Sequence, residues 1–468
     1  MRFKRKIGVI IKKGMRKIQK IYETTQEINF LSPQKEFSLY WHRFQLSPLG
    51  EIHQAIPWHE LAKSFRLRNS GKGREAIFTS QGKLALMFLK AYTEFSDSML
   101  IENLNGNLEY QLFCGILLGT ERLEDFKIVS RIRTDLAKLL KVNRSQQILA
   151  QAWKPYLKDT QILLEDATCY ESYVRYPTNV KLLWESVEWL YAQMKITCKY
   201  LKIRMPRSKY NEQSEKYYTY SRKRRKNNKD TRVRTRSLLH LLEKLIDQQE
   251  NIVSQSNQKI DFPKRYTSRF RVIKKVLAQQ QEMFETGESV RDRIVSIDKA
   301  YIRPIIRGKE VKKVEFGAKV NMIQIDGINF IEHLSFNAFN EGTRLKQSIY
   351  YGRILFGKIT HFAGDDIYAT NANRKYCTSK NISTNFKRKG RAGKHEEHRE
   401  IMARELRKER ATRMEGSFGT EKQHYSLDKI KARTELNEIL WIFFGVHTAN
   451  AVRISKYFAK ENQHRKIA

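Results

Sequence analysis

The chain has 468 residues, of which 40% are hydrophobic, and it includes 24 Phe and 22 Tyr. This is enough for two or three domains with a large buried core, and it excludes a disordered basic tail. Its 89 Lys and Arg outnumber its 50 Asp and Glu, so the formal net charge is +39. An excess of this size favours a polyanionic partner, most commonly nucleic acid. Basicity alone also fits a ribosome-like or membrane-surface protein.

The cysteines and the apolar runs indicate a soluble protein of a reducing compartment. Cys114, Cys169, Cys198 and Cys377 are far apart and form no CxxC pair, which argues against a disulfide framework or a structural zinc site. No stretch reaches the roughly 20 apolar residues that a membrane span needs. The most apolar run, Leu436–Ala451, contains Glu438 and His447, so we expect a buried helix there.

Residues 1–150 are predicted to be a helical domain, and we regard it as a candidate DNA-binding domain. Trp58, Leu61 and Phe65 recur at helical spacing. Ser96 is predicted to cap a further helix.

The pattern changes at 161–170, where QILLEDATCY is typical of a short buried strand. A helix is predicted from Lys181 to about Tyr200, and a leucine-rich helix at 237–253. Between them, Ser221–Arg236 has nine basic residues and one acidic. We give equal weight to two interpretations of this run, a solvated surface and a DNA-contacting arm that uses Arg222, Arg224 and Arg225. Residues 186–290 are thus predicted to be a basic helical insertion.

From about Arg293 the chain becomes rich in Val, Ile and Phe, which predicts strands. Asp326-Gly327 between apolar segments is a strong hairpin signal. A helix at 342–356, a strand ending at 364–368, a charged helix at 394–410 and a final apolar helix follow. The element order fits an α/β sheet whose first strand is separated from the others by the insertion, so residues 151–185 and 291–468 are predicted to form one domain.

Acidic residues near predicted strands are candidate ligands of a hard cation, because carboxylates among phosphates repel one another unless a cation lies between them. Two such ions can support in-line displacement at phosphorus without any His or Cys. Glu165 and Asp166 are adjacent on a strand, so only one can face a site, and the same holds for Asp365 and Asp366. On composition alone, a surface carboxylate or an ion-pair partner is the favoured interpretation of any single acid.

Glu415 and Lys422 are seven residues apart, so a helix places both on one face, where Lys422 could hold a phosphate near Glu415. Gly416 and Gly419 would each weaken that helix by ~1 kcal/mol relative to Ala. We interpret them as allowing close approach of another element or of DNA.

Several segments along the chain share residues with one known family. In the N-terminal region they are Ile56–Ala62, Gly73–Arg74, Gly82–Lys90, Phe95–Leu104 and Tyr110–Gly115. Further along they are Leu163–Ser172, Tyr176–Trp184, Tyr301–Lys309, Glu315–Val320, Gly364–Arg374 and Met414–Lys422. With these segments the chain resembles the DDE transposases of bacterial insertion sequences, in the broad group that includes insertion sequences four and five.

The resemblance implies a catalytic triad of Asp166, Asp365 and Glu415. The family pattern places the second Asp three residues before a Tyr, which selects Asp365 over Asp366. The family also has a Tyr and an Arg upstream of the Glu, whereas Lys408 and Ala411 stand at those positions here. The Arg is displaced to Arg410 or Arg413. The basic residues predicted to contact DNA are Lys422, Arg413, Arg410, Arg303, Arg307, Lys319, Arg222, Arg224 and Arg225.

The implied fold is an RNase H-like α/β core of mixed sheet, with the helical N-terminal domain and the helical insertion after its first strand. The implied cofactors are two Mg²⁺ ions, with Mn²⁺ as an alternative, held by the three acids. Such enzymes cut double-stranded DNA at element ends with water, and the freed 3′-OH then attacks target DNA. They usually assemble as homodimers on DNA. Because these transposases are bacterial and act on DNA, the resemblance also implies a cytoplasmic protein associated with the nucleoid.

Two other functions compete with this hypothesis. A metal-dependent nuclease would use the same carboxylates to cut DNA without joining it. A non-catalytic DNA-binding protein derived from a transposase would need none of the three acids.

Overall fold

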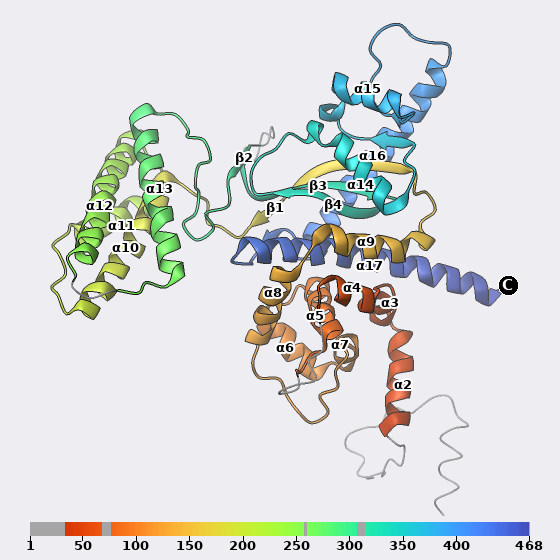
Figure 1. The fold of residues 1–468 in the computed structure, drawn as a ribbon, viewed down its shortest axis with the longest axis horizontal. Coiled ribbons are helices and arrows are strands. Elements are labelled where there is room, and N and C mark those ends of the chain that lie inside the picture. The colour runs from red at the N-terminus through yellow and green to blue at the C-terminus, as the bar shows by residue number, and fades with distance from the viewer. Residues whose placement is uncertain (1–32, 68–75, 257–259, 307–313, 468) are drawn as a thin grey trace, which may run out of the picture.

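The computed structural model describes residues 33–67, 76–256, 260–306 and 314–467. Arg307 and the motif residues Gly73–Arg74 lie outside these ranges. Figure 1 shows a helical N-terminal body, a sheet with its covering helices, and a helical body set apart at the other side of the sheet. The N-terminal body and the sheet lie on opposite sides of the long C-terminal helix α17 (Glu435–Ile467) (Figure 1).

The N-terminal region is helical, as predicted. Its helices are α2 (Pro33–Gln45), α3 (Pro48–Gln54), α4 (Trp58–Ser64), α5 (Ser80–Thr93), α6 (Asp97–Gly106), α7 (Leu108–Phe113), α8 (Lys127–Leu139) and α9 (Val142–Trp153), followed by the 3₁₀ turn η1 (Lys154–Tyr156). The predicted cap is confirmed, because the Ser96 hydroxyl accepts a hydrogen bond from the Met99 N–H at the start of α6. Phe88 of α5 packs edge-on against Phe444 of α17, so the first and last parts of the chain share one core.

The sheet is mixed, and the strand that carries Asp166 lies at its centre. Its strands run in the order β2-β3-β1-β5-β6, with β4 also paired to β3 and β7 to β1. Strand β1 is antiparallel to β3 and parallel to β5. The bounds are β1 (Ile162–Ser172), β2 (Pro304–Ile306), β3 (Val314–Ile325), β4 (Ile328–Ser335), β5 (His361–Ala363), β6 (Ser383–Thr384) and β7 (Lys429–Ile430).

The predicted hairpin is confirmed. Asp326 and Gly327 join β3 to β4 with φ of 46° and 81°, and Ile325 pairs with Ile328. Two successive positive φ values are what a two-residue hairpin turn with the right twist requires, and Gly adopts them without steric strain.

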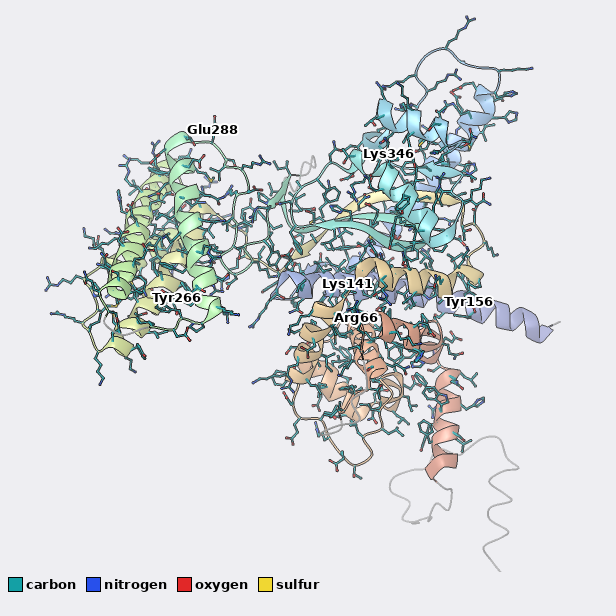
Figure 2. All side chains as sticks on the ribbon, viewed as in Figure 1. Arg66, Lys141, Tyr156, Tyr266, Glu288 and Lys346 are labelled. Carbon is teal, nitrogen blue, oxygen red and sulfur yellow. The ribbon has the colours of Figure 1, made fainter. Side chains whose placement is uncertain are left out.

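The insertion between β1 and β2 has its own hydrophobic core. Its helices are α10 (Asn179–Leu201), α11 (Tyr210–Arg222), α12 (Asn228–Ser254) and α13 (Lys264–Thr286). Leu183, Leu190 and Leu242 are fully buried in this core. Tyr266 and Glu288 mark this body in Figure 2, whereas Lys346 belongs to the helix α14 beside the sheet. Helix α10 begins before residue 186, so the domain boundary predicted there falls inside one continuous helix.

After the hairpin, short helices and strands complete the sheet domain. They are η2 (Glu341–Thr343), α14 (Leu345–Phe356), η3 (Asp366–Tyr368), α15 (Asn371–Ser379) and α16 (Glu396–His424). The charged helix predicted at 394–410 and the segment after it are one helix, α16. A Cβ on Gly416 or Gly419 would meet nothing within 4 Å, so the expectation that these glycines admit another element of the chain is wrong.

The C-terminal helix is buried where the sequence predicted it. Glu438 and His447 of α17 are both fully buried, and Glu438 pairs with Lys299. The four cysteines are buried and unbridged, as expected. None of the helices in the described ranges is both long enough and apolar enough to cross a membrane.

Candidate active site

Two of the three predicted acids are brought together by strand register. In the parallel pair β1–β5, Leu163 lies opposite Phe362 and Leu164 opposite Ala363. Asp166 lies two residues after Leu164 on β1, and Asp365 lies two residues after Ala363, just past the end of β5, so the end of this pairing brings the two aspartates to the same region. Residues far apart in the sequence therefore meet near the centre of the sheet.

Arg410 of α16 lies between these two aspartates. Its Nη1 is 2.8 Å from Oδ2 of Asp166, and its Nη2 is 3.9 Å from Oδ1 of Asp365. The side chains of Arg410 and Asp166 are 17% and 20% exposed, whereas Asp365 is 61% exposed. The two carboxylates thus converge on one positive charge at a point that solvent reaches.

Asp166 lies in an environment that opposes its negative charge. Burial raises the pKa of its carboxyl above the ordinary value, and the charges of Glu341 and Asp365 raise it further. Arg410 and the hydrogen bond from the Ala167 N–H act in the opposite direction. A cation beside Asp166 therefore favours its ionised form.

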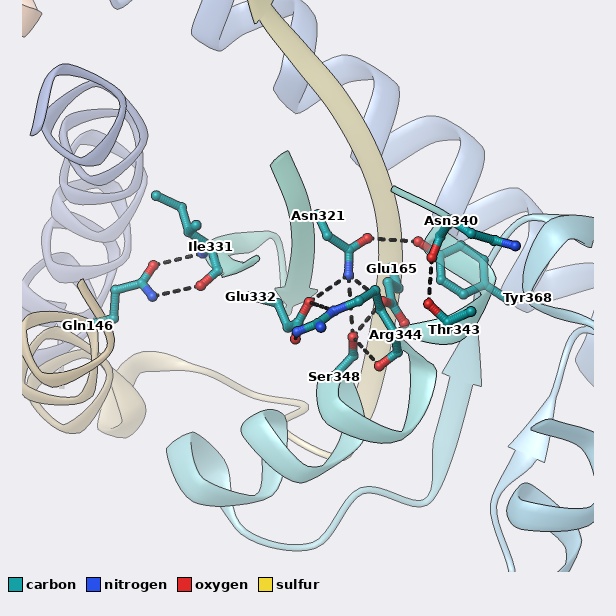
Figure 3. A network of polar contacts seen from close by, with 10 residues as sticks. All are labelled: Gln146, Glu165, Asn321, Ile331, Glu332, Asn340, Thr343, Arg344, Ser348 and Tyr368. Atoms are coloured by element: carbon teal, nitrogen blue, oxygen red, sulfur yellow. Dashed lines mark hydrogen bonds and ion pairs between the residues drawn. The ribbon is translucent and has the colours of Figure 1, made fainter. Parts of the chain in front are cut away.

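Glu165 points to the opposite face of β1, which confirms that only one of the two neighbours faces the site. Its Oε1 accepts hydrogen bonds from Asn321 Nδ2 at 2.6 Å and from the Ser348 hydroxyl (Figure 3). Burial raises the pKa of Glu165 to about 8. Glu165 is therefore part of the packing between the sheet and α14.

Asp365 and Asp366 also differ in placement. The Asp365 carboxylate accepts a hydrogen bond from the Asp366 N–H at the start of η3 and faces Arg410. Asp366 is exposed and lies within the 3₁₀ turn. Of Asp365 and Asp366, only Asp365 contacts Arg410, the residue that also pairs with Asp166.

Glu415 does not join the two aspartates. It lies on α16 and is exposed. It follows Arg410 by five residues, which at 100° per residue turns it about 140° away around the helix axis. Within the described ranges no three His, Cys, Asp or Glu side chains are close enough to hold a metal ion together.

The predicted DNA-contacting residues other than Arg410, described above, differ in their exposure and in their partners. Arg222, Arg224 and Arg225 are exposed at the end of α11 and just after it. Arg413 pairs with Glu409 and Asp326, and Lys422 lies 5.9 Å from the Tyr170 ring. Lys319 pairs with Glu341, and Arg303 donates to backbone carbonyls at 300 and 302. Arg307 lies outside the described residues.

The donor set fits a hard divalent cation at the Asp166–Asp365 pair. Carboxylate oxygens are the preferred ligands of Mg²⁺, and both side chains already turn toward one positive charge. Sequence reasoning did not find Glu341, whose charge acts on Asp166, because no motif or spacing marks it. It also did not find the buried hydroxyl of Tyr368, although the family pattern pointed to that residue.

Comparisons with known proteins bear on the N-terminal region. Residues 39–135 match the family model described as "Transposase domain (DUF772)". Neither the search of curated proteins nor the search of solved structures gave a match. The match supports a relationship of this region to transposases.

Proposed function

We propose that the protein is a DNA transposase of the DDE type, which cuts insertion-sequence ends and joins the freed 3′-OH to target DNA. The observation that carries the proposal is the convergence of Asp166 and Asp365 on Arg410 at the centre of a mixed sheet. The transposase-domain match at 39–135 supports it independently, because that region contains neither aspartate.

We further propose that this sheet is the RNase H-like core that the sequence resemblance implies. Strand β1, with antiparallel β3 on one side and parallel β5 on the other, supports this fold. So does the insertion of α10–α13 after the first strand of the sheet.

In the proposed reaction, the carboxylate oxygens of Asp166 and Asp365 would hold Mg²⁺. Bound there, the ions would activate water or a 3′-OH and stabilise the leaving oxygen of the phosphodiester. Arg410 pairs with the same carboxylates in the structure, so it lowers the pKa of Asp166 against the effect of burial and holds the two side chains together. Asp365 is the better candidate of its pair because of its contact with Arg410.

Glu415 is retained as the proposed third carboxylate on the strength of the Met414–Lys422 segment. Glu415 and Lys422 share one face of α16, as the Glu-x6-Lys spacing requires. The open space beside Gly416 and Gly419 supports the approach of DNA along this face.

Double-stranded DNA, both as element ends and as target, is the proposed partner, and a homodimer the proposed assembly. The net charge of +39 and the exposed Arg222, Arg224 and Arg225 support binding to the phosphate backbone. A bacterial cytoplasm is the proposed location.

The test uses the full chain and labelled duplexes made from the DNA that flanks its coding region. With Mg²⁺, a transposase cuts the duplex at the element end and joins a pre-cut 3′-OH end to a plasmid. A nuclease cuts without joining, and a non-catalytic binder shifts the duplex in a gel without either product. Failure to cut or join under conditions where the duplex is bound contradicts the proposal.

A further inference from the structure

Asp365 has an exposed carboxylate, so its position must come from the backbone that carries it. Its side chain is 61% exposed and lies directly after β5, at the start of the turn η3. The Tyr368 N–H donates to the Asp365 carbonyl at 3.0 Å, which closes that turn. Whatever holds Tyr368 therefore also holds the backbone of Asp365.

Tyr368 is held in the core by both its ring and its hydroxyl. The residue is fully buried, and its ring lies 5.9 Å from that of Phe362 on β5. Its hydroxyl donates to Oδ1 of Asn321 on β3 at 2.8 Å (Figure 3). The turn bearing Asp365 is thus connected to a strand on the other side of β1.

Asn321 is the centre of a buried polar network that reaches four elements. Its Nδ2 lies 2.6 Å from Glu165 of β1, 2.9 Å from Glu332 of β4 and 3.4 Å from Ser348 of α14. Arg344 pairs with Glu332 and so completes the network (Figure 3). Because these partners fix the Asn321 amide, its oxygen is presented to Tyr368 in one orientation.

A second set of contacts holds the same turn from its other side. Asn373 Nδ2 donates to the carbonyls of Tyr368 and Gly342, at 2.8 and 2.7 Å. A Cβ on Gly342 would lie 2.3 Å from the Ile367 carbonyl, so the turns η2 and η3 are in close contact. The turn is thereby restrained on both sides, and the Tyr368 hydroxyl supplies the link to the sheet.

We propose that Tyr368 and Asn321 are positioning residues that hold Asp365 beside Asp166 for binding a divalent cation. This inference rests on the proposed function, because it assigns Asp365 to a metal site. Glu165 contributes from the opposite face of β1, since its burial in the same network fixes which face Asp166 takes. Carboxylates that bind one metal ion together depend on neighbouring residues whose contacts hold them at the required separation.

Tyr368→Phe tests the inference, because it removes the hydroxyl and leaves the ring packing. The matched control is Tyr351→Phe, since Tyr351 is also a buried tyrosine whose hydroxyl bonds a buried amide, Gln146, at 2.8 Å. The main measurement is the binding of Mn²⁺ to the full chain, monitored by the loss of the EPR signal of the free ion. The concentration of Mg²⁺ that half-saturates cleavage is the second.

We expect Tyr368→Phe to weaken Mn²⁺ binding about tenfold, the size typical of a lost contact to a metal ligand. Tyr351→Phe should bind Mn²⁺ as the wild type does. Equal binding by Tyr368→Phe and wild type overturns the inference, as does equal weakening in both variants, which would indicate general loosening of the core. If Asp365→Ala binds Mn²⁺ as tightly as wild type, the metal site in the proposed function fails, and the positioning role fails with it.

Discussion

Helix α16 contacts β1 at two places through a carboxylate, and the two contacts differ in kind. At one, Arg410 pairs with Asp166 and Asp365 where solvent has access. At the other, Glu421 is 1% exposed and lies between the Tyr170 hydroxyl and Asn329 Nδ2, which both donate to it. Arg410 and Glu421 are on the same face of the helix, roughly 20° apart around its axis.

The carboxylate of Glu421 is structural, whereas those of Asp166 and Asp365 are available for chemistry. Glu421 has neutral donors as partners and no access to solvent, so its interactions are satisfied within the fold. Asp166 and Asp365 have a charged partner that a metal ion can replace, and they remain accessible. Substitutions should therefore affect activity at the Arg410 contact and stability at the Glu421 contact.

The largest effect is expected from removing either aspartate of the Arg410 contact. Asp166→Ala and Asp365→Ala should each lower Mg²⁺-dependent cleavage by roughly a thousandfold, since losing about 4 kcal/mol of transition-state stabilisation has that effect. Binding of end DNA should change little. Single-turnover cleavage and gel shifts measure the two quantities. Asp366→Ala is the control, and loss of cleavage in it instead of in Asp365→Ala would show that the wrong neighbour was selected.

Glu421→Ala should break the buried contact and lower the free energy of unfolding by about 2–4 kcal/mol, because the Tyr170 hydroxyl and Asn329 amide lose their acceptor. Thermal unfolding followed by circular dichroism measures this change. Glu415→Ala on the exposed face of the same helix is the matched control. It should leave the unfolding temperature unchanged and abolish cleavage, and unchanged cleavage would remove Glu415 from the proposed site.

Arg410→Ala should strengthen divalent-ion binding, because the arginine competes with the ion for Asp166 and Asp365. A partly exposed ion pair is worth about 1 kcal/mol, which corresponds to roughly fivefold tighter Mn²⁺ binding by calorimetry. Arg413→Ala, which removes pairs with Glu409 and Asp326 instead, should bind Mn²⁺ as wild type does. Weaker binding in Arg410→Ala would mean that the arginine organises the carboxylates more than it competes for them.

The pH dependence of stability should also distinguish the two contacts. Burial raises the pKa of Glu421 from 4.5 to about 7, so the folded protein favours the protonated acid. Its contribution to stability is complete below pH 4.5 and is lost as the pH rises to about 7. Urea titrations across this range should show a shallower decline for Glu421→Gln than for wild type. Parallel declines in the two proteins would contradict the assigned burial effect.

The local patterns of the sequence were informative where one residue type dictates one geometry. Asp326-Gly327 predicted the hairpin because few other residues adopt two successive positive φ values. The alternation of side chains along a strand predicted that Glu165 and Asp166 would face opposite ways. The motif around Gly364–Arg374 selected Asp365, and the structure places that residue, and not Asp366, against Arg410.

Other features lay beyond these patterns. Helical spacing predicted that Glu415 and Lys422 share a face, but not that this face turns away from Arg410. The sequence predicted a charged helix only to Arg410, whereas α16 continues to His424, because burial of Met414, Phe418 and Glu421 outweighs the low helix propensity of Gly416 and Gly419. Nothing in the sequence indicated that Asn321 and Tyr368 would be hydrogen-bonded.

The sequence by itself determined many of the helical and strand segments, the hairpin and the list of candidate acids, because these depend on residue spacing and on local backbone preference. Only the tertiary structure decided which acids meet. The meeting of Asp166 with Asp365 follows from the parallel register of β1 and β5, and the insertion of Arg410 between them from the packing of α16 across the sheet. Both are contacts between distant segments, and their geometry is set by the burial of the whole core.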